Sequence, residues 1–299
     1  MTSQPPPSCA LISGTDLARQ ARAEVKARVE LLKARGVTPR LDVLLVGDHA
    51  PSQLYVRNKV KAAEEVGVHA EVHRLPSDLS GEAIRAQVRA LNARPETHGV
   101  LIQLPLPPHI SSAEAWSIVE EVSPHKDVDG LHPLNQGLIG LSDEGFVACT
   151  PLGCLRLIRE VMPDLRGVRA VVVGRSRIVG RPMAQLLSAA DATVTLCHSR
   201  TADLARHTRD AELIVAAAGA PRLITADLVS PGAVVIDVGI HRLEGAGPQG
   251  EALLCGDVDF EAVRHVARAL TPVPGGVGPM TIASLMQNVC LAAERATRS

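Results

Sequence analysis

The first half of the chain alternates between helix-spaced apolar positions and short apolar runs. An amphipathic helix is predicted from about residue 17 to a stop at Gly36, with Thr15 or Asp16 as its cap, because apolar side chains recur there every three or four residues. Strands are predicted over 41–46, 69–75 and 99–104, and further helices over about 51–67 and 81–93. This alternation is typical of an α/β unit.

The second half has the pattern of a nucleotide-binding sheet. A looser stretch over 129–145 is interpreted as the linker before a helix that begins near Pro151. The first apolar strand, 168–173, runs into Gly174 and a helix to about 190, and further strands are predicted over 193–197, 213–217 and 234–238. This series predicts a Rossmann-type, doubly wound parallel sheet. A last apolar helix from about 281 to 296 is expected to pack back on the first domain.

The chain length of 299 residues favours two domains, because single cores usually stop growing near that size. We predict a mobile tail over 1–9, an N-terminal α/β domain over 10–145 that includes the C-terminal helix 281–299, and a Rossmann domain over 146–280. The composition, 46% apolar and 21% charged, supports buried cores. The net charge of −1 gives no general attraction to nucleic acid or to an anionic membrane, so a small ligand is expected.

The six cysteines are scattered without C-x-x-C spacing, which indicates neither a zinc ribbon nor a disulfide framework. The segment 1–7 is polar and proline-rich, unlike a signal sequence, and the chain has no run of about 18 apolar residues. Reduced, mostly buried thiols and a cytoplasmic location are therefore expected.

A glycine turn follows the first strand of the predicted Rossmann sheet. Gly174 ends the strand and Gly180 begins the helix, and such a turn lets backbone N–H groups approach a phosphate. Ser176 replaces the second glycine of G-x-G-x-x-G and Gly180 comes one residue late, so a simple packing turn is the alternative. After the next strand, 198–201 carries a hydroxyl and cations but no carboxylate, which suits the extra phosphate of NADP. Arg175 adds a cation, unless these arginines are ordinary surface charges.

A hydroxyl, a phenol and an amine fall on one face of a predicted helix. Tyr55, the only tyrosine, stands four residues before Lys59, and Ser52 shares their face. This favours a catalytic site, although a solvent-facing lysine beside a partly packed tyrosine is an equal alternative. Short-chain dehydrogenases place Tyr-x-x-x-Lys after the nucleotide loop, whereas here it precedes Gly174. Gln103 ends an apolar strand, where it either faces a crevice or caps the strand end.

The segment 126–130 carries two carboxylates, Asp127 and Asp129, between His125 and His132. A metal site is one interpretation, but Lys126 and the alternating directions of neighbouring side chains disfavour it, and no metal is predicted.

Loop capping, and recognition of a ligand's N–H groups by one carboxylate, both remain open for this segment. The glycine-rich segment 271–281 either permits close backbone approach to a ligand or is an ordinary helix-entry loop.

Taken in order, these segments resemble the bifunctional methylenetetrahydrofolate dehydrogenase/methenyltetrahydrofolate cyclohydrolase family. The resemblance runs from about residue 10 to the C-terminus, and the ordered set is far more specific than any one member. The matching segments are 52–59 with 61–65, 103–107, 126–130, 132–135, 149–151, 174–180, 198–201, 237–239, 256–258 and 271–281.

The resemblance implies a role for each candidate residue. Lys59 would be the catalytic lysine, and Gln103 would tune it. Tyr55 would pack on the aromatic part of the folate, and Asp129 would anchor the pterin. The remaining substrate-binding residues would be Ser52, and Pro274 and Gly275 at a cleft between the domains. NADP would be held by Gly174, Arg175, Ser176, Ser199 and Ile240.

The implied activity is NADP-dependent oxidation of methylenetetrahydrofolate followed by hydrolysis of the methenyl product, in a homodimer. The sequence departs from the family at His241, where asparagine is common, and at Ala220, where a longer polar residue is common. Two alternatives are a shikimate dehydrogenase-like enzyme, which would not explain Tyr55, Gln103 and Asp129, and a non-enzymatic folate- or nucleotide-binding protein, which loss of Lys59 would have favoured.

Overall fold

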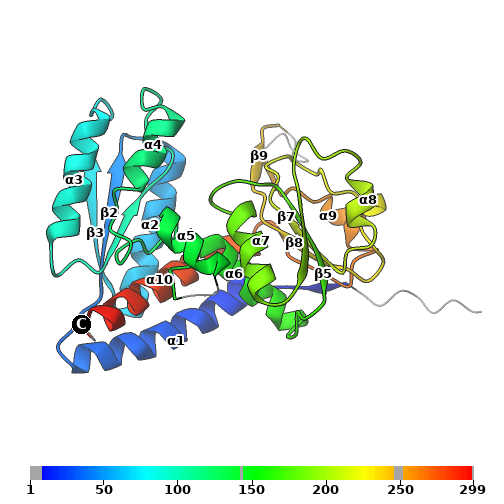
Figure 1. Cartoon of the computed structure of the whole chain (residues 1–299), viewed down its shortest axis with the longest axis horizontal. Helices are drawn as coiled ribbons and strands as arrows, with labels where there is room; N and C mark the ends of the chain where they lie inside the picture. Colours follow the sequence, from blue (N-terminus) through cyan, green and yellow to red (C-terminus); the bar gives the residue numbers. More distant parts are fainter. Residues whose placement is uncertain (1–8, 142–143, 246–251, 298–299) are drawn as a thin grey trace, which may run out of the picture. The chain divides into compact units, whose positions relative to one another are not determined.

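The computed structural model describes residues 9–141, 144–245 and 252–297, so nearly all of the predicted tail lies outside the described residues. The chain divides into two compact units, which we name by their main sheets. The six-stranded unit comprises residues 1–17 and 150–281, and the three-stranded unit comprises residues 18–149 and 282–299. Both units are α/β, as predicted (Figure 1).

The three-stranded unit contains a parallel sheet with the order β3-β2-β4. The strands are β2 (Arg40–Val46), β3 (His69–Leu75) and β4 (Gly99–Ile102). Helices α2 to α5 belong to this unit: α2 (Ala50–Val66), α3 (Gly81–Ala93), α4 (Ser112–Val119) and α5 (Pro133–Gly140). Most of α1 (Gly14–Ala34) and α10 (Val277–Ala296) also belongs to it.

Apart from Arg40 and Asp42, the central strand β2 is apolar on both faces because helices cover both. Leu41, Val43 and Leu45 pack with buried side chains of α1, α2 and α10. Leu44 and Val46, on the other face, pack with α3 and α4. A parallel sheet covered in this way needs an almost unbroken apolar strand. The prediction that the C-terminal helix packs on the first domain is confirmed, since α10 contributes to the first of these clusters.

The six-stranded unit is a wholly parallel sheet with the order β1-β11-β8-β7-β5-β6. Its strands are β1 (Ala10–Leu11), β5 (Arg169–Val173), β6 (Thr193–Cys197), β7 (Leu213–Ala216), β8 (Val234–Asp237) and β11 (Ala269–Leu270). The chain passes from β5 to β6 on one side and then to β7 on the other. The switch point between β5 and β7 is where such sheets bind ligands, and the Rossmann prediction is confirmed.

Shorter elements complete the six-stranded unit. An antiparallel hairpin is formed by β9 (His241–Leu243) and β10 (Leu253–Cys255). The helices are α6 (Cys149–Val161), α7 (Gly180–Ala189), α8 (Ala205–Thr208), α9 (Phe260–Val263) and the 3-10 turn η1 (Ala226–Leu228).

Three differences from the sequence-based prediction concern the first domain boundary and the starts of two helices. Residues 10–17 group with the six-stranded unit, because β1 pairs with β11. The cap of α1 is Ser13, whose Oγ accepts from the Asp16 N–H at 3.2 Å. The expected linker contains α5, which Pro133 begins at its first turn and His132 caps. Among the described residues, no helix is long and apolar enough to cross a membrane, and all six cysteines are free.

Candidate functional site

Lys59 and Gln103 meet at the carboxyl end of the three-stranded sheet. Lys59 lies on α2, and its Nζ donates to Oε1 of Gln103, the first residue after β4, at 3.0 Å. The Gln103 amide nitrogen donates to the Leu104 carbonyl at 2.7 Å, and its backbone N–H donates to the Leu44 carbonyl. These bonds turn the amide oxygen toward the amine, so the lysine faces a neutral acceptor.

Tyr55 lies one helical turn before Lys59 on α2, and its side chain is 44% exposed. Ser52 is 3% exposed, and its Oγ lies 2.9 Å from Nδ1 of His49. The phenol is therefore open to a ligand, whereas the serine hydroxyl already has a partner within the protein. The predicted substrate contact of Ser52 stays a prediction.

The three charged residues of the segment 126–130 have different environments. The side chain of Lys126 reaches the C-terminal end of α3, where its Nζ donates to the carbonyls of Asn92 at 2.8 Å and Arg94 at 2.6 Å. Burial lowers the pKa of Lys126. Since helix C-termini leave carbonyls without helical partners, this lysine acts as a cap.

Asp127 ties together the loop that leads into α5. Its buried carboxylate accepts from the N–H groups of Leu131 and His132 and from Nδ2 of Asn135, at 2.8 to 3.1 Å. Burial raises its pKa to about 6 despite these bonds. The loop-capping interpretation therefore holds for Asp127.

Asp129 and Lys59 both influence the pKa of one buried thiol, that of Cys149. Burial and the Asp129 carboxylate raise the pKa of Cys149 well above its usual range, while the Lys59 ammonium opposes the shift. The half-buried Asp129 also receives the Cys149 N–H at its backbone carbonyl, at 3.3 Å. The structure thus brings Lys59, Gln103 and Asp129 into one part of the three-stranded unit.

Sequence reasoning missed Asn288, a buried residue of α10. Its Nδ2 donates to the carbonyls of Val128 and Val147, each at 2.9 Å, and so joins the two segments beside Asp129. The available signal was a lone asparagine within an apolar helix, because a buried amide must find hydrogen-bond partners.

The glycine turn after β5 lies at the switch point of the six-stranded sheet. Gly174 has φ 121°, and a Cβ there would overlap the Ala217 carbonyl, which follows β7. A Cβ at Gly180 would in turn overlap the Gly174 carbonyl. Ser176 Oγ accepts from the N–H groups of Val179 and Gly180 at 3.2 and 3.3 Å. The close packing needs glycine here, and the serine caps the entry to α7.

The other predicted nucleotide-binding side chains are exposed. Arg175 and Ser176 are exposed in the glycine turn, and Ser199 is exposed after β6. Ile240, after β8, is 54% exposed. These residues at the strand ends offer an exposed cation, hydroxyls and an apolar side chain, a combination that suits a dinucleotide. None of them is a carboxylate, which would repel the phosphates.

Pro274 and Gly275 belong to the six-stranded unit. The Val273–Pro274 peptide is cis, and Gly275 has φ 101°. The Gly275 carbonyl accepts from the Thr15 N–H at 3.0 Å. Their substrate contacts stay a prediction.

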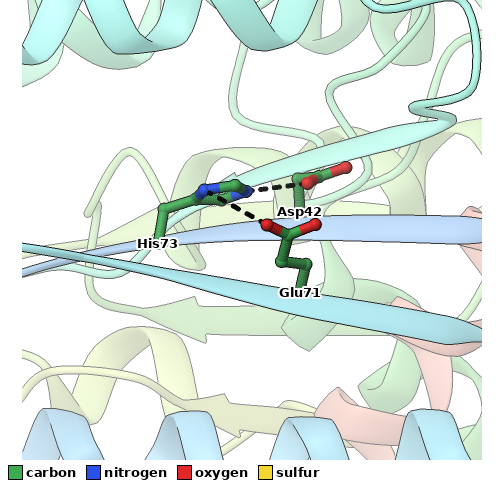
Figure 2. A group of neighbouring side chains, drawn as sticks. All are labelled: Asp42, Glu71 and His73. Atoms are coloured by element: carbon green, nitrogen blue, oxygen red, sulfur yellow. Dashed lines mark hydrogen bonds and ion pairs between the residues drawn. The ribbon is translucent and has the colours of Figure 1, made fainter.

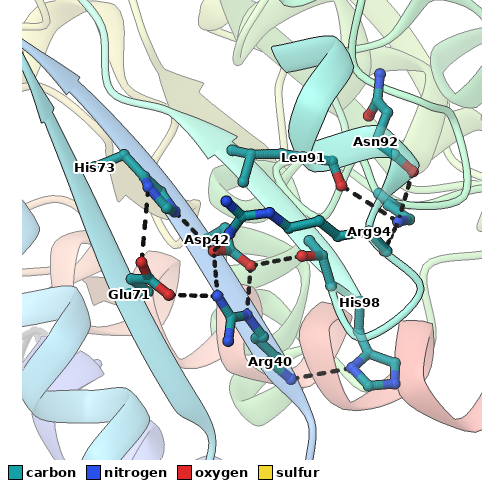
Figure 3. A network of polar contacts seen from close by, with 10 residues as sticks. Arg40, Asp42, Glu71, His73, Leu91, Asn92, Arg94 and His98 are labelled. Carbon is teal, nitrogen blue, oxygen red and sulfur yellow. Dashed lines mark hydrogen bonds and ion pairs between the residues drawn. The ribbon is translucent and has the colours of Figure 1, made fainter. Parts of the chain in front are cut away.

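In the described part of the chain, one cluster has side chains spaced for a metal ion: Asp42, Glu71 and His73 (Figure 2). Arg40 occupies the position that a cation would need, because its guanidinium donates to both carboxylates (Figure 3). Thr97 and His73 complete the bonds to Asp42. We therefore assign the cluster to an ion-pair network.

Comparisons with known proteins agree over both units. Residues 12–129 match the tetrahydrofolate dehydrogenase/cyclohydrolase catalytic domain, and residues 148–297 match the NAD(P)-binding domain of the same name. A bifunctional protein FolD from Acidovorax ebreus is 54% identical over 286 residues, which are 95% of this chain and 98% of that protein.

Two solved structures have the same fold. The bifunctional FolD methylenetetrahydrofolate dehydrogenase/cyclohydrolase from Campylobacter jejuni has a TM-score of 0.90 at 44% identity, covering 96% of this chain and 99% of that one. The FolD of Trypanosoma brucei, complexed with NADP and an inhibitor, has a TM-score of 0.91 at 37% identity, covering 98% and 100%.

Proposed function

Since the chain belongs to the tetrahydrofolate dehydrogenase/cyclohydrolase family, we propose that it oxidises 5,10-methylenetetrahydrofolate with NADP and hydrolyses the 5,10-methenyl product to 10-formyltetrahydrofolate. The observation that carries the proposal is the Lys59–Gln103 hydrogen bond of 3.0 Å at the carboxyl end of the three-stranded sheet. A shikimate dehydrogenase-like enzyme or a binding protein would not need this pair.

The first step depends on positioning. Bound NADP supplies the acceptor for the hydride that leaves the methylene bridge. The folate nitrogens provide the electrons, so the protein's part is to hold the folate in place. The exposed Tyr55 would pack on its aromatic part, and the Asp129 carboxylate would accept hydrogen bonds from the pterin N–H groups.

The second step is assigned to Lys59. Water attacks the cationic methenyl carbon, whose C=N π electrons return to nitrogen; the Lys59 amine either takes the water's proton or polarises the water while the proton passes to solvent. The carbon–N5 bond then breaks, N5 takes a proton, and the 10-formyl group remains on N10. Gln103 holds the amine through a neutral oxygen, which leaves the group without a salt-bridge partner in this pair.

NADP is the proposed cofactor because the turn after β6 offers Ser199 and Arg200 without a carboxylate. Gly174, Arg175, Ser176 and Ile240 would hold the rest of the dinucleotide. The glycine packing at the switch point supports this, since a side chain at Gly174 could not be accommodated against the β7 segment.

Absorbance of the purified protein with methylenetetrahydrofolate tests the proposal, with NADP compared against NAD and the methenyl compound followed separately. We expect reduction with NADP and faster-than-spontaneous loss of added methenyltetrahydrofolate. Lys59→Met should remove the second activity by a factor of about 100 or more, while a Lys61→Met variant on the same helix serves as control. Normal cyclohydrolase rates in Lys59→Met would refute the assigned role.

We also propose a homodimer formed through the six-stranded unit, and a cytoplasmic location. The edge strand β6 supports the dimer, because one of its sides pairs with no other strand among the described residues, and it carries the exposed Leu196. Sedimentation equilibrium should give twice the chain mass for the wild type and a weaker association for Leu196→Glu. A monomer would contradict this proposal without affecting the assigned reactions.

A further inference from the structure

A buried carboxylate shapes the backbone at the switch point of the six-stranded sheet. Asp257 is fully buried, two residues after β10. Its Oδ2 accepts from the N–H groups of Ala218 and Gly219 at 2.6 and 2.9 Å, and its Oδ1 accepts from Ala220 N–H at 3.1 Å. Three consecutive amides thus converge on one side chain.

The segment held in this way packs against the glycine turn that follows β5. Ala217 and Ala218 follow β7 directly, and a Cβ at Gly174 would overlap the Ala217 carbonyl and make a tight contact of 3.0 Å with the Ala218 nitrogen. Asp257 also binds a residue that comes soon after this segment, since the Ile224 N–H donates to the Asp257 backbone carbonyl at 2.9 Å. The position of residues 218–220 therefore depends on Asp257.

His241 provides the fourth hydrogen bond to this carboxylate. Its Nε2 lies 2.7 Å from Asp257 Oδ1, and its side chain is 19% exposed. An ionised carboxylate only accepts, so Nε2 carries the hydrogen. In the hairpin, His241 is paired with Cys255, which fixes the imidazole beside the chain that leads to Asp257. His241 also directly follows Ile240, a proposed nucleotide contact.

We propose that His241 is a positioning residue for the nicotinamide dinucleotide. It acts through Asp257. The imidazole holds Oδ1, and the carboxylate holds the amides of residues 218–220. These amides fix the backbone segment that packs against Gly174 in the glycine turn after β5. A charge-assisted bond to a fully buried acceptor is among the stronger hydrogen bonds in proteins, and loss of its donor leaves that acceptor short of a partner.

This inference rests on the proposed function for its ligand, and it predicts a selective effect. The dehydrogenase step needs the dinucleotide, whereas hydrolysis of added methenyltetrahydrofolate does not. A residue that positions the backbone of residues 218–220 beside the nucleotide site should therefore affect the first activity and not the second. A residue needed only for general stability would affect both.

Two variants test the proposal in the full-length protein. His241→Gln places an amide nitrogen where Nε2 lies and keeps the donor, while His241→Leu removes it at similar size. The measurements for each variant are the NADPH affinity by calorimetry, the KM for NADP and the kcat of the dehydrogenase reaction, and the cyclohydrolase rate. For His241→Leu we expect about fivefold or greater increases in Kd and KM, a cyclohydrolase rate within about twofold of wild type, and near-normal values for His241→Gln.

Equal NADPH affinity in the wild type and His241→Leu would overturn the proposal. So would a parallel loss of both activities in the two variants, since that indicates a structural role alone. If the wild type bound NADPH but oxidised no methylenetetrahydrofolate, the proposed reaction would fail, while the calorimetric comparison would still decide the role of His241.

Discussion

The Lys59 ammonium donates to the Gln103 side-chain oxygen at 3.0 Å, although the two residues come from a helix and from the end of a strand. The glutamine is itself fixed by the Leu104 carbonyl, so its oxygen cannot turn away without losing that bond. The amine is held by a neutral group, which distinguishes this pair from a salt bridge and gives the first prediction.

Gln103→Glu should lower cyclohydrolase activity at pH 7 by about tenfold. A carboxylate beside the amine stabilises its charged form and reduces its field on water. If Lys59 takes a proton, activity should recover as the pH rises; if it polarises water, the pH profile should keep its shape. The measurement is the rate of methenyltetrahydrofolate hydrolysis from pH 6 to 9. Wild-type rates throughout would contradict both roles, and unchanged NADPH affinity is the control.

Asn288→Ala should raise the KM for the folate several-fold and lower the free energy of unfolding by about 1–3 kcal/mol, because the buried carbonyls of Val128 and Val147 lose their donor. Trp116, the only tryptophan, lies on α4 and reports unfolding of the three-stranded unit by fluorescence. The control is Gln287→Ala, a less buried neighbour on α10. An unchanged KM would show that Asn288 does not position Asp129.

Lys126→Met should destabilise the three-stranded unit by about 2 kcal/mol while leaving the folate KM within about twofold. Its ammonium caps the carbonyls at the end of α3, and the methionine keeps the apolar stem without the charge. Asp129→Asn provides the opposite comparison, with a raised KM expected. The role assigned to Lys126 is incorrect if the two variants raise KM equally.

The strands and long helices could be predicted because their patterns are local. The apolar run of β2 is required by helices on both faces, and Gly67, with φ 81°, ends α2 as expected. The resemblance identified Lys59 and Gln103, but spacing could not give their contact, since it joins residues 44 positions apart. Short sequence windows contain no information on such pairs.

The missed features depend on distant partners or on atypical composition. β1 is two residues long and exists through pairing with β11, at the other end of the chain. The helix α5 contains Gly137 and Gly140, so composition favours a loop, yet Pro133 and the His132 cap stabilise its first turn. Asn288 and His241 gained roles when the structure showed which buried groups they contact.

The last prediction concerns Asp42, the fully buried centre of the network in Figure 3. Burial alone would raise the pKa of this carboxyl, but hydrogen bonds from Arg40, His73 and Thr97 outweigh burial, and the pKa lies below its ordinary value of 3.8. A group with a lowered folded-state pKa stabilises the fold above its unfolded pKa, and that contribution is lost as the pH falls through the folded value.

Asp42→Asn should therefore lower the free energy of unfolding by about 3 kcal/mol at pH 7, because it leaves Arg40 without its buried partner. The difference from wild type should shrink as the pH falls below the ordinary carboxyl pKa of 3.8, because the unfolded chain then binds a proton that the folded Asp42 carboxylate still resists. Urea unfolding followed by Trp116 fluorescence measures this, with the exposed Asp78→Asn as control. A difference that stayed constant down to pH 3 would mean that Asp42 stabilises the sheet through packing and not through its charge.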